Sequence, residues 1–258
     1  MHLDIRKNFE EKVSYVAQHL SGMLINDQSS FLSVDCGLPS DTFNVIVGRD
    51  LRAMTPMIAE VDRFIAKGFP FALWCWESTI DKASLSQLAR HGLVHTETHQ
   101  AMYIDLSQLQ MTEDYVEGLE ITQITTTNEL LQFGKIIADL FGDASEGRQV
   151  FTYFQRLSAS PQNLFPAMRY YLGTLQGKIV TIGTIFVGSQ TVGIYDLVTH
   201  NDYRRRGIGN TMFQHLLKEA RDSNRRFAIL QASNDGLGIY LRAGFKRTGD
   251  VLTFEVRK

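Results

Sequence analysis

The sequence predicts an α/β protein of two parts, and three observations support this prediction. The chain has 258 residues, of which 44% are hydrophobic and 21% charged, so it has an ordinary globular composition with room for two domains. Strand-like and helix-like patterns alternate along the C-terminal half. The N-terminal half repeats the order of those patterns.

Composition and charge exclude several classes of protein. Only 5 prolines and no low-complexity tract argue against long disordered segments, and a net charge of −2 lacks the basic footprint of a nucleic-acid binder. The first residues, "MHLDIRKNFEEK", lack the apolar run of a signal peptide, and no stretch is long enough to cross a membrane. Cys36 and Cys75 form no close motif and fit a reducing compartment. We therefore expect a cytoplasmic protein without nucleic-acid or membrane partners.

The C-terminal half alternates predicted strands and helices. A short strand over 119–125 precedes a helix that Thr127 or Asn128 is suited to cap, and 144–160 favours a second helix. Strands over 167–177 and 178–188 meet at a tight turn, and a third covers 191–199. A strongly amphipathic helix starts near Ile208. It is followed by a buried strand over 226–232, a short helix stopped by Gly244 and a closing strand bent at Gly249.

The N-terminal half resembles a degenerate copy of this ending. "FALWCWES" parallels "FAILQASN", and "QLARHGLVHTETHQAMYIDL" parallels "IYLRAGFKRTGDVLTFEV". An internal repeat is the economical explanation; the alternative is chance similarity, because short apolar strands look alike. We expect a linker within 107–118 and domains over residues 1–112 and 113–258.

The stretch "YRRRGIGNTM" lies between a predicted strand and a predicted helix. Glycines and unpaired N–H groups at a helix N-terminus make an anion site, and arginines add charge and bidentate hydrogen bonds. Alternatively, the arginines are a solvated run and the glycines only turn the chain. Two familiar phosphate motifs fail here, because Asn210 and Thr211 replace the Lys-Ser/Thr of a Walker loop and Met212 replaces the third glycine of a dinucleotide fingerprint.

At this point the chain resembles the GNAT superfamily of acetyltransferases. Arg204-x-x-Gly207-x-Gly209 is similar to that family's acyl-CoA pyrophosphate motif, and Asn234, Tyr240 and Gly244-Phe245 are similar to its later motif. The resemblance covers residues 119–258. It implies an α+β fold with a mixed, mainly antiparallel sheet flanked by helices, and the internal repeat then implies a tandem of two GNAT-like units.

The resemblance also implies roles by position, with acetyl-CoA as acyl donor. Backbone groups of the strand before the turn would pair with the pantetheine arm, the turn would bind the pyrophosphate, Asn234 would contact the cofactor arm and Tyr240 would stand near the thioester sulfur. The implied cofactor-binding residues are Leu197, Val198, Thr199, Arg204, Arg205, Arg206, Gly207, Ile208, Gly209, Asn210, Asn234 and Tyr240.

Acyl transfer to an amine needs a proton donor and a proton acceptor. Tyr240 suits the departing thiolate, because its ordinary pKa of about 10 lies not far above a thiol's at about 8.5; the alternative is a tyrosine packed in the core. Some family members carry a glutamate early in the fourth strand, where this chain has Gly193, so Asp196 is the nearest acidic replacement and His200 lies just beyond. The N–H of Val198 or Thr199 is a candidate oxyanion donor.

Other polar and aromatic patterns are interpreted as structural. His91, His95 and His99 lie four residues apart, as metal ligands can, but Gly92 and the alternating pattern after it favour a turn and a strand over a helix. His95 and His99 could then share a face, whereas His91 need not, so we expect no metal site. Trp74 and Trp76 share a strand face and suit core or interdomain packing; the alternative is a stacking platform.

The N-terminal copy lacks the site residues. "RDLRAMTP" replaces the glycine turn, and Leu88 stands in the place of Tyr240. We therefore expect one acetyl-CoA per chain and no metal. The predicted function is N-acetyl transfer from acetyl-CoA to an unidentified primary amine in a ternary complex, since no cysteine lies in the motifs. The alternatives are a non-catalytic acyl-CoA-binding module, or an acyltransferase for another acyl chain or acceptor.

Overall fold

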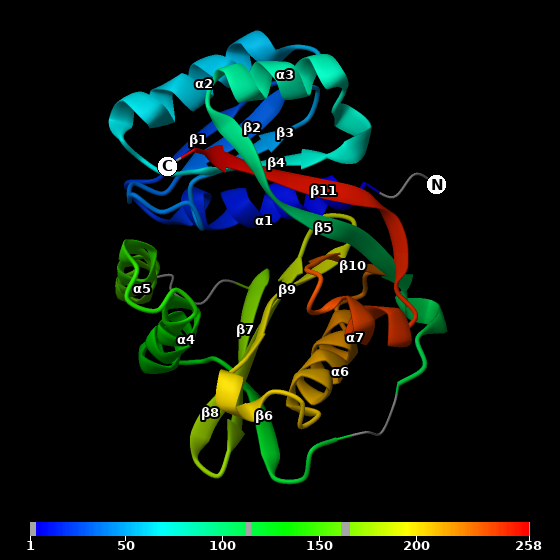
Figure 1. Ribbon diagram of the computed structural model, residues 1–258. Coiled ribbons are helices and arrows are strands. Elements are labelled where there is room, and N and C mark those ends of the chain that lie inside the picture. Colours follow the sequence, from blue (N-terminus) through cyan, green and yellow to red (C-terminus); the bar gives the residue numbers. More distant parts are fainter. Residues whose placement is uncertain (1–3, 112–114, 161–165, 258) are drawn as a thin grey trace.

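A computed structural model describes residues 4–111, 115–160 and 166–257 of the chain (Figure 1). The described residues form one eleven-stranded sheet in the order β1-β2-β3-β4-β11-β5-β10-β9-β8-β7-β6. Neighbouring strands are antiparallel except for β3 with β4 and β9 with β10. The predicted mixed, mainly antiparallel sheet flanked by helices is thus confirmed.

The N-terminal half contributes a leading helix, five strands and two further helices. Its elements are α1 (Ile5–His19), β1 (Leu24–Asp27), β2 (Phe31–Asp35), β3 (Val45–Gly48), α2 (Met54–Lys67), β4 (Ala72–Trp76), η1 (Glu77–Thr79), α3 (Lys82–Arg90), β5 (Leu93–Asp105) and η2 (Leu106–Gln108).

The C-terminal half follows the predicted order closely. Its elements are β6 (Leu119–Gln123), α4 (Thr127–Asp139), α5 (Ser145–Ala159), β7 (Met168–Leu175), β8 (Lys178–Val187), β9 (Val192–Thr199), η3 (Asn201–Tyr203), α6 (Ile208–Arg221), β10 (Phe227–Ala232), α7 (Leu237–Arg242) and β11 (Lys246–Val256). One local prediction was wrong. Thr126 caps α4, because its hydroxyl accepts from the Glu129 N–H while the Glu129 side chain accepts from the Thr126 N–H, so both groups at the helix start are satisfied.

The two halves share a strand–helix–strand unit. An amphipathic helix, α2 in one half and α6 in the other, connects two parallel neighbouring strands, β3 with β4 and β9 with β10. A short helix and a long strand then follow in each half, α3 with β5 and α7 with β11. This order is the one that the internal repeat predicts.

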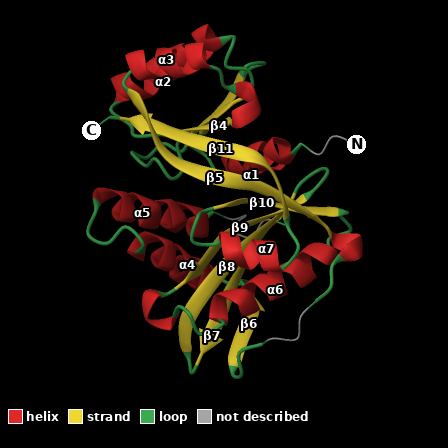
Figure 2. Ribbon diagram, turned by 45° about the vertical axis from the view of Figure 1, so that its right-hand side comes forward, coloured by secondary structure: helices red, strands yellow, loops and turns green. Residues whose placement is uncertain are grey.

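The last strands of the two halves are exchanged. β5 of the N-terminal half pairs with β10, whereas β11 of the C-terminal half pairs with β4, and β5 and β11 pair with each other along their length. Figure 2 shows these two long strands crossing the middle of the molecule. The expected boundary between residues 112 and 113 lies outside the described residues. Because each half completes the other's sheet, neither segment carries its whole sheet by itself.

The helices divide into three packed groups. α2 and α3 pack on the N-terminal part of the sheet, and α6 and α7 pack against β8, β9 and β10. α1, α4 and α5 share a third core with residues of both halves, and α1 lies beside the crossing strands (Figure 1). The side of the sheet opposite α6 and α7 is therefore where the two halves meet.

Two further expectations concern membranes and cysteines. Among the described residues, no helix combines the length and hydrophobicity that a membrane crossing requires. Cys36 and Cys75 are free and buried. Burial raises the pKa of the Cys36 thiol to about 12 and that of Cys75 further still, so both thiols stay protonated and unreactive at neutral pH.

Candidate active site

A gap opens between the parallel strands β9 and β10. They pair only at Val192 with Ala228 and at Gly193 with Ile229, after which their C-terminal ends diverge. In the N-terminal half, the equivalent strands β3 and β4 stay paired over four positions, from Val45 with Ala72 to Gly48 with Cys75. Ligands of open sheets bind outside the carboxyl ends of parallel strands. Only the C-terminal half therefore offers a gap between the ends of its parallel strands, as judged from the described residues.

A bulge in β9 brings Asp196 to this gap. Ile182 pairs with Val198 and Thr184 with Tyr195, so Asp196 and Leu197 together oppose the single residue Gly183. Asp196 adopts a φ of 51°, which is uncommon for a residue with a side chain and accompanies local strain. Asp196, Leu197 and Val198 all line one cavity of about 520 Å³.

The glycine turn begins α6 beside β9. Gly207 is the N-cap with a φ of 81°, and the first helical hydrogen bond runs from the Thr211 N–H to the Gly207 carbonyl. The N–H groups of Ile208, Gly209 and Asn210 precede that bond and point out of the helix end. A Cβ on Gly209 would stand 3.0 Å from the Thr199 hydroxyl oxygen. The glycine thus lets the helix start lie close to β9.

The three arginines of the turn are exposed and differ in their contacts. The Arg204 Nε donates to the Thr199 carbonyl at 3.2 Å, which ties the turn to the end of β9. The Arg206 guanidinium lies 5.3 Å from the centre of the Tyr203 ring. Arg205 has a φ of 60° and its side chain is exposed. They surround the helix start with positive charge without filling it.

Tyr240 lies on α7, which packs with α6 on one face of the sheet, and its side chain lines the cavity at the gap. Its ring packs edge-on against Phe213 with centroids 5.0 Å apart, and a Cβ on Gly236 would stand 3.1 Å from its hydroxyl oxygen. Burial raises the pKa of Tyr240 to about 12, so the hydroxyl keeps its proton at neutral pH. The structure thus places the predicted acid and Asp196 on the walls of one cavity.

Asn234 and His200 are not among the residues that line this cavity. Asn234 is exposed in the loop between β10 and α7. His200 is exposed and caps the short helix η3, where its Nδ1 accepts from the Asp202 N–H.

At Gly193, where some family members carry a glutamate, the space for a side chain is occupied by Asn8 of α1. Any side chain on Gly193 would collide with the Asn8 amide and the Tyr195 ring. Asn8 is 1% exposed; its Nδ2 donates to the Thr191 carbonyl at 2.9 Å, and its Oδ1 accepts from the Tyr195 hydroxyl at 2.8 Å. The N-terminal helix therefore explains why this strand carries a glycine.

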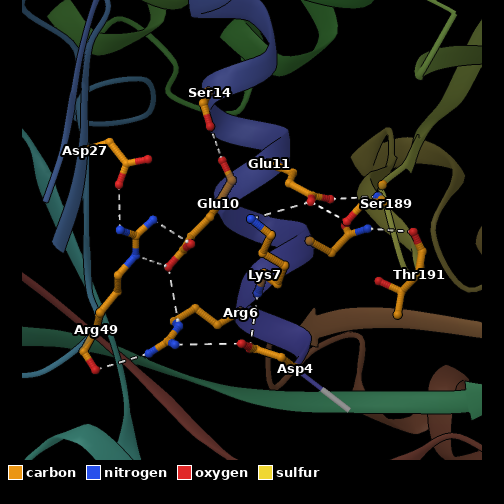
Figure 3. A network of polar contacts seen from close by, with 12 residues as sticks. Asp4, Arg6, Lys7, Glu10, Glu11, Ser14, Asp27, Arg49, Ser189 and Thr191 are labelled. Carbon is orange, nitrogen blue, oxygen red and sulfur yellow. Dashed lines mark hydrogen bonds and ion pairs between the residues drawn. The ribbon is translucent and has the colours of Figure 1, made fainter. Parts of the chain in front are cut away.

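A polar network anchors α1 to both halves. Figure 3 shows Glu10 facing Arg49 of the N-terminal half, with its two carboxylate oxygens 2.9 Å from two guanidinium nitrogens. In the same region, Glu11 accepts from the Ser189 N–H at 2.9 Å and from its hydroxyl at 2.5 Å. α1 thereby fixes the halves relative to each other beside the cavity.

Sequence reasoning allowed the N-terminal half to shape the acceptor pocket or simply to complete the fold, but it did not identify the residues that this half contributes to the walls. The lining includes Phe9 and Lys12 of α1, Phe43 before β3, Trp74 of β4 and His99 of β5. Trp74 does pack with Phe9 at 4.8 Å as core packing predicts, but it is also a cavity wall. Only the pairing of β5 with β10, where Gln100 faces Ala232, brings His99 beside the end of β10. No local pattern could have signalled this.

His95 and His99 do not share a face, which corrects that expectation. A register shift between Thr253 and Phe254 leaves Thr96 as an extra residue in β5. His95 then contacts Thr98 at 2.9 Å, whereas His99 stacks on Trp74 and lies 3.2 Å from Glu97. Among the described residues, no group of three His, Cys, Asp or Glu side chains has the arrangement of a metal site.

Comparisons with known proteins agree with this geometry. Residues 143–255 match the model of the acetyltransferase (GNAT) domain family. A comparison with curated proteins finds no significant match.

Solved structures resemble the chain over nearly its whole length. A GCN5-related N-acetyltransferase from Kribbella flavida has 16% identity and a TM-score of 0.65, with 96% of this chain and 95% of that one covered. One from Sphaerobacter thermophilus has 14% identity and a TM-score of 0.61, covering 98% and 91%. A tandem GNAT protein from the clavulanic acid biosynthesis pathway has 11% identity and a TM-score of 0.59, covering 94% and 86%. Residues 143–255 therefore match the GNAT acetyltransferase domain family, and the whole chain has the fold of these solved structures, one of which is a tandem GNAT protein.

Proposed function

We propose that the protein transfers an acetyl group from acetyl-CoA to a primary amine, by direct attack in a ternary complex. The match of residues 143–255 to the GNAT family supports acetyl-CoA-dependent acyl transfer in general. The single observation that carries the finer proposal is the cavity at the gap between β9 and β10, which Tyr240 and Asp196 line together. A proton donor and a proton acceptor would thus face the reacting groups from opposite sides.

The donor substrate fits the groups that the chain leaves available. The N–H groups of Ile208, Gly209 and Asn210, with Arg204, Arg205 and Arg206 around them, would hold the pyrophosphate. The diverging backbone of Leu197–Thr199 would pair with the pantetheine arm. The Gln231 Nε2 is buried beside the gap and, among the described residues, has no hydrogen-bond partner, so it is a further donor for that arm. Asn234 would contact the arm from the exposed loop between β10 and α7.

A second cavity suits the outer end of acetyl-CoA. It has a volume of about 590 Å³ and lies between α6 and α7, with Asn210, Arg242 and Lys246 among its lining residues. It adjoins the N-terminus of α6, where the pyrophosphate would bind. Two basic side chains there would favour the phosphorylated adenosine.

In the reaction, the acceptor first loses a proton, which Asp196 would take directly or through water. The amine nitrogen then bonds to the thioester carbon, and the N–H of Val198 or Thr199 would stabilise the oxyanion. The carbon–sulfur bond breaks, and the thiolate takes the Tyr240 proton. The attacking nitrogen loses its second proton, which returns to Tyr240 through solvent, and Asp196 releases the first proton to solvent, so the net products are the acetylated amine, CoA and one proton.

The N-terminal half would bind no second acetyl-CoA. β3 and β4 stay paired, the turn after β3 leads into α2 without a glycine cradle, and Leu88 is fully buried in the place of Tyr240. We propose residues 1–112 and 113–258 as the two units, with acetyl-CoA bound by the second.

Thiol release from acetyl-CoA over a panel of amines tests the function. Amine-dependent release with one acetyl-CoA bound per chain in calorimetry is the expected result. Binding of acetyl-CoA without release for any acceptor would favour a non-catalytic acyl-CoA-binding module instead. Faster release from a longer acyl-CoA, or with alcohols, would indicate another acyl chain or acceptor.

A further inference from the structure

The cavity at the gap extends well beyond the thioester site. Its walls come from α1, from strands of both halves and from α4 and α5, on the side of the sheet opposite α6 and α7. The proposed acetyl-CoA site lies on the α6 side. The rest of the cavity, of about 520 Å³ in total, is therefore available to the acceptor, and its lining reports what kind of molecule fits.

Asp196 lies among buried tyrosine rings. Tyr153, Tyr170 and Tyr195 line the cavity and are each at most 9% exposed. Burial raises the pKa of all three hydroxyls above the ordinary value, and the negative charge of Asp196 raises each further. A carboxylate that shares a cavity with aromatic rings is an environment that stabilises an alkylammonium group.

The charges around the cavity are mostly negative. Four carboxylates line it, those of Asp41, Glu97, Asp196 and Glu255, whereas Lys12 is the single lysine or arginine among the described lining residues. The Lys12 ammonium lies 5.0 Å from the centre of the Tyr195 ring. Burial lowers the pKa of His99, only partly opposed by Glu97, so its imidazole is neutral at pH 7. These carboxylates would repel a carboxylate or phosphate group on the acceptor.

Two stacked ring pairs form flat walls of the cavity. Phe43 stacks on Tyr153 with centroids 3.6 Å apart and an angle of 10°. His99 stacks on Trp74 with centroids 4.9 Å apart and an angle of 17°. These surfaces match an aromatic ring, whereas the hydroxyl groups of a sugar would lose water against them without new partners.

We propose that the acceptor is a small primary amine with an aromatic or bulky apolar body and no carboxylate. Its ammonium group lies at Asp196, and its body lies between the Phe43–Tyr153 and Trp74–His99 walls. This inference rests on the proposed function, because it identifies the acceptor of that same site. It also gives the N-terminal half a role, since Phe43, Trp74 and His99 come from it.

Matched pairs of amines test the charge requirement. Thiol release from acetyl-CoA is measured with 2-phenylethylamine and tryptamine, with their carboxylated counterparts phenylalanine and tryptophan, and with spermidine. The kcat/KM values for the two arylalkylamines should exceed those for the matching amino acids and for spermidine at least 100-fold. Equal values within a pair, or preference for spermidine, would overturn the inferred acceptor class and leave the proposed function intact.

A matched pair of variants tests the aromatic wall. Trp74→Leu should raise the KM for tryptamine at least 10-fold without changing the Kd for acetyl-CoA. Trp76→Leu is the control, because Trp76 packs against the same Phe9 ring at 5.8 Å but is not among the cavity residues. Equal KM changes in the two variants would overturn the aromatic wall as a binding surface.

Calorimetry separates failure of the inference from failure of the function. Tryptamine is titrated into the protein saturated with CoA. Binding without thiol release for any amine would overturn the proposed transfer while supporting the acceptor class. Neither binding nor release for tryptamine, with release for another amine, would overturn the acceptor class alone.

Discussion

Replacing Tyr240 with phenylalanine removes one oxygen atom and tests the proposed proton donor. The ring contacts to Phe213 at 5.0 Å and to Phe245 at 6.2 Å are kept, and within the described chain the hydroxyl makes no hydrogen bond that would be lost. The variant should therefore fold and bind acetyl-CoA normally. Any loss of turnover then reports the hydroxyl's chemical role rather than a packing defect.

The expected magnitude follows from the protonation state. Burial raises the pKa of Tyr240 to about 12, so the donor is fully protonated up to about pH 10, while a CoA thiol has an ordinary pKa of about 8.5. General acid catalysis contributes roughly 100- to 10,000-fold, which is about 2.7 to 5.4 kcal/mol of the barrier. We expect Tyr240→Phe to lower kcat by at least about 100-fold.

The assay is thiol release at saturating acetyl-CoA, with Kd for CoA measured by calorimetry. Tyr171→Phe is the matched control, because that tyrosine is also buried but its hydroxyl bonds Glu219 at 3.1 Å, away from the cavity. The control should keep its turnover. Tyr240→Phe with more than half of the wild-type kcat would refute the acid role.

Three further predictions concern the cofactor turn, the α1 anchor and acid stability. Gly209→Val should raise the KM for acetyl-CoA at least about 10-fold, because the new side chain fills the close approach of α6 to β9. Asn8→Ala should lower the free energy of unfolding by about 1 to 3 kcal/mol, because it leaves the buried Tyr195 hydroxyl without its partner, whereas the Thr191 carbonyl keeps its bond from the Gly188 N–H. Burial by itself would raise the pKa of Asp35, but hydrogen bonds from Lys67 and Arg63 hold that pKa below 3.8 in the folded protein. The ionised Asp35 therefore stabilises the folded state fully above pH 3.8, and this contribution is lost as the pH falls through the folded-state pKa. Asp35→Asn should thus flatten the acid limb of the plot of unfolding free energy against pH.

Each of these predictions has a measurement and a contrary outcome. Initial rates at varied acetyl-CoA check Gly209→Val, and an unchanged KM would contradict the turn as a cofactor site. Urea unfolding checks Asn8→Ala against Tyr195→Phe, which leaves only the Asn8 oxygen unpaired and should cost about 1 to 3 kcal/mol; strictly additive losses in the double variant would contradict the shared bond. Asp35→Asn with an unchanged acid midpoint would contradict the linkage.

The sequence predicted most of the local structure because local signals determine it. The period of apolar residues specified α6, the Gln176–Gly177 pair specified the β7–β8 turn with its positive φ angles, and Gly244 stopped α7. The spacing of Gly207, Gly209 and Tyr240 likewise pointed to the cofactor side of the site. The observed cap of α4 is Thr126 and not the predicted Thr127 or Asn128. Two adjacent threonines offer equivalent hydroxyls, and only the contact with Glu129 distinguishes them.

The tertiary structure decided the cavity that we propose for the acceptor. His99, Trp74 and Phe43 line the cavity because β5 and β11 are exchanged between the halves and α1 bridges them, and such long-range pairing leaves no period or spacing in the chain. The same holds for Gly193, whose lack of a side chain is explained by Asn8, 185 positions earlier in the chain. The sequence by itself determined the elements and the glycine turn at Gly207–Gly209, since these depend on neighbours along the chain. The pocket depends on contacts between distant segments, which only the folded sheet brings together.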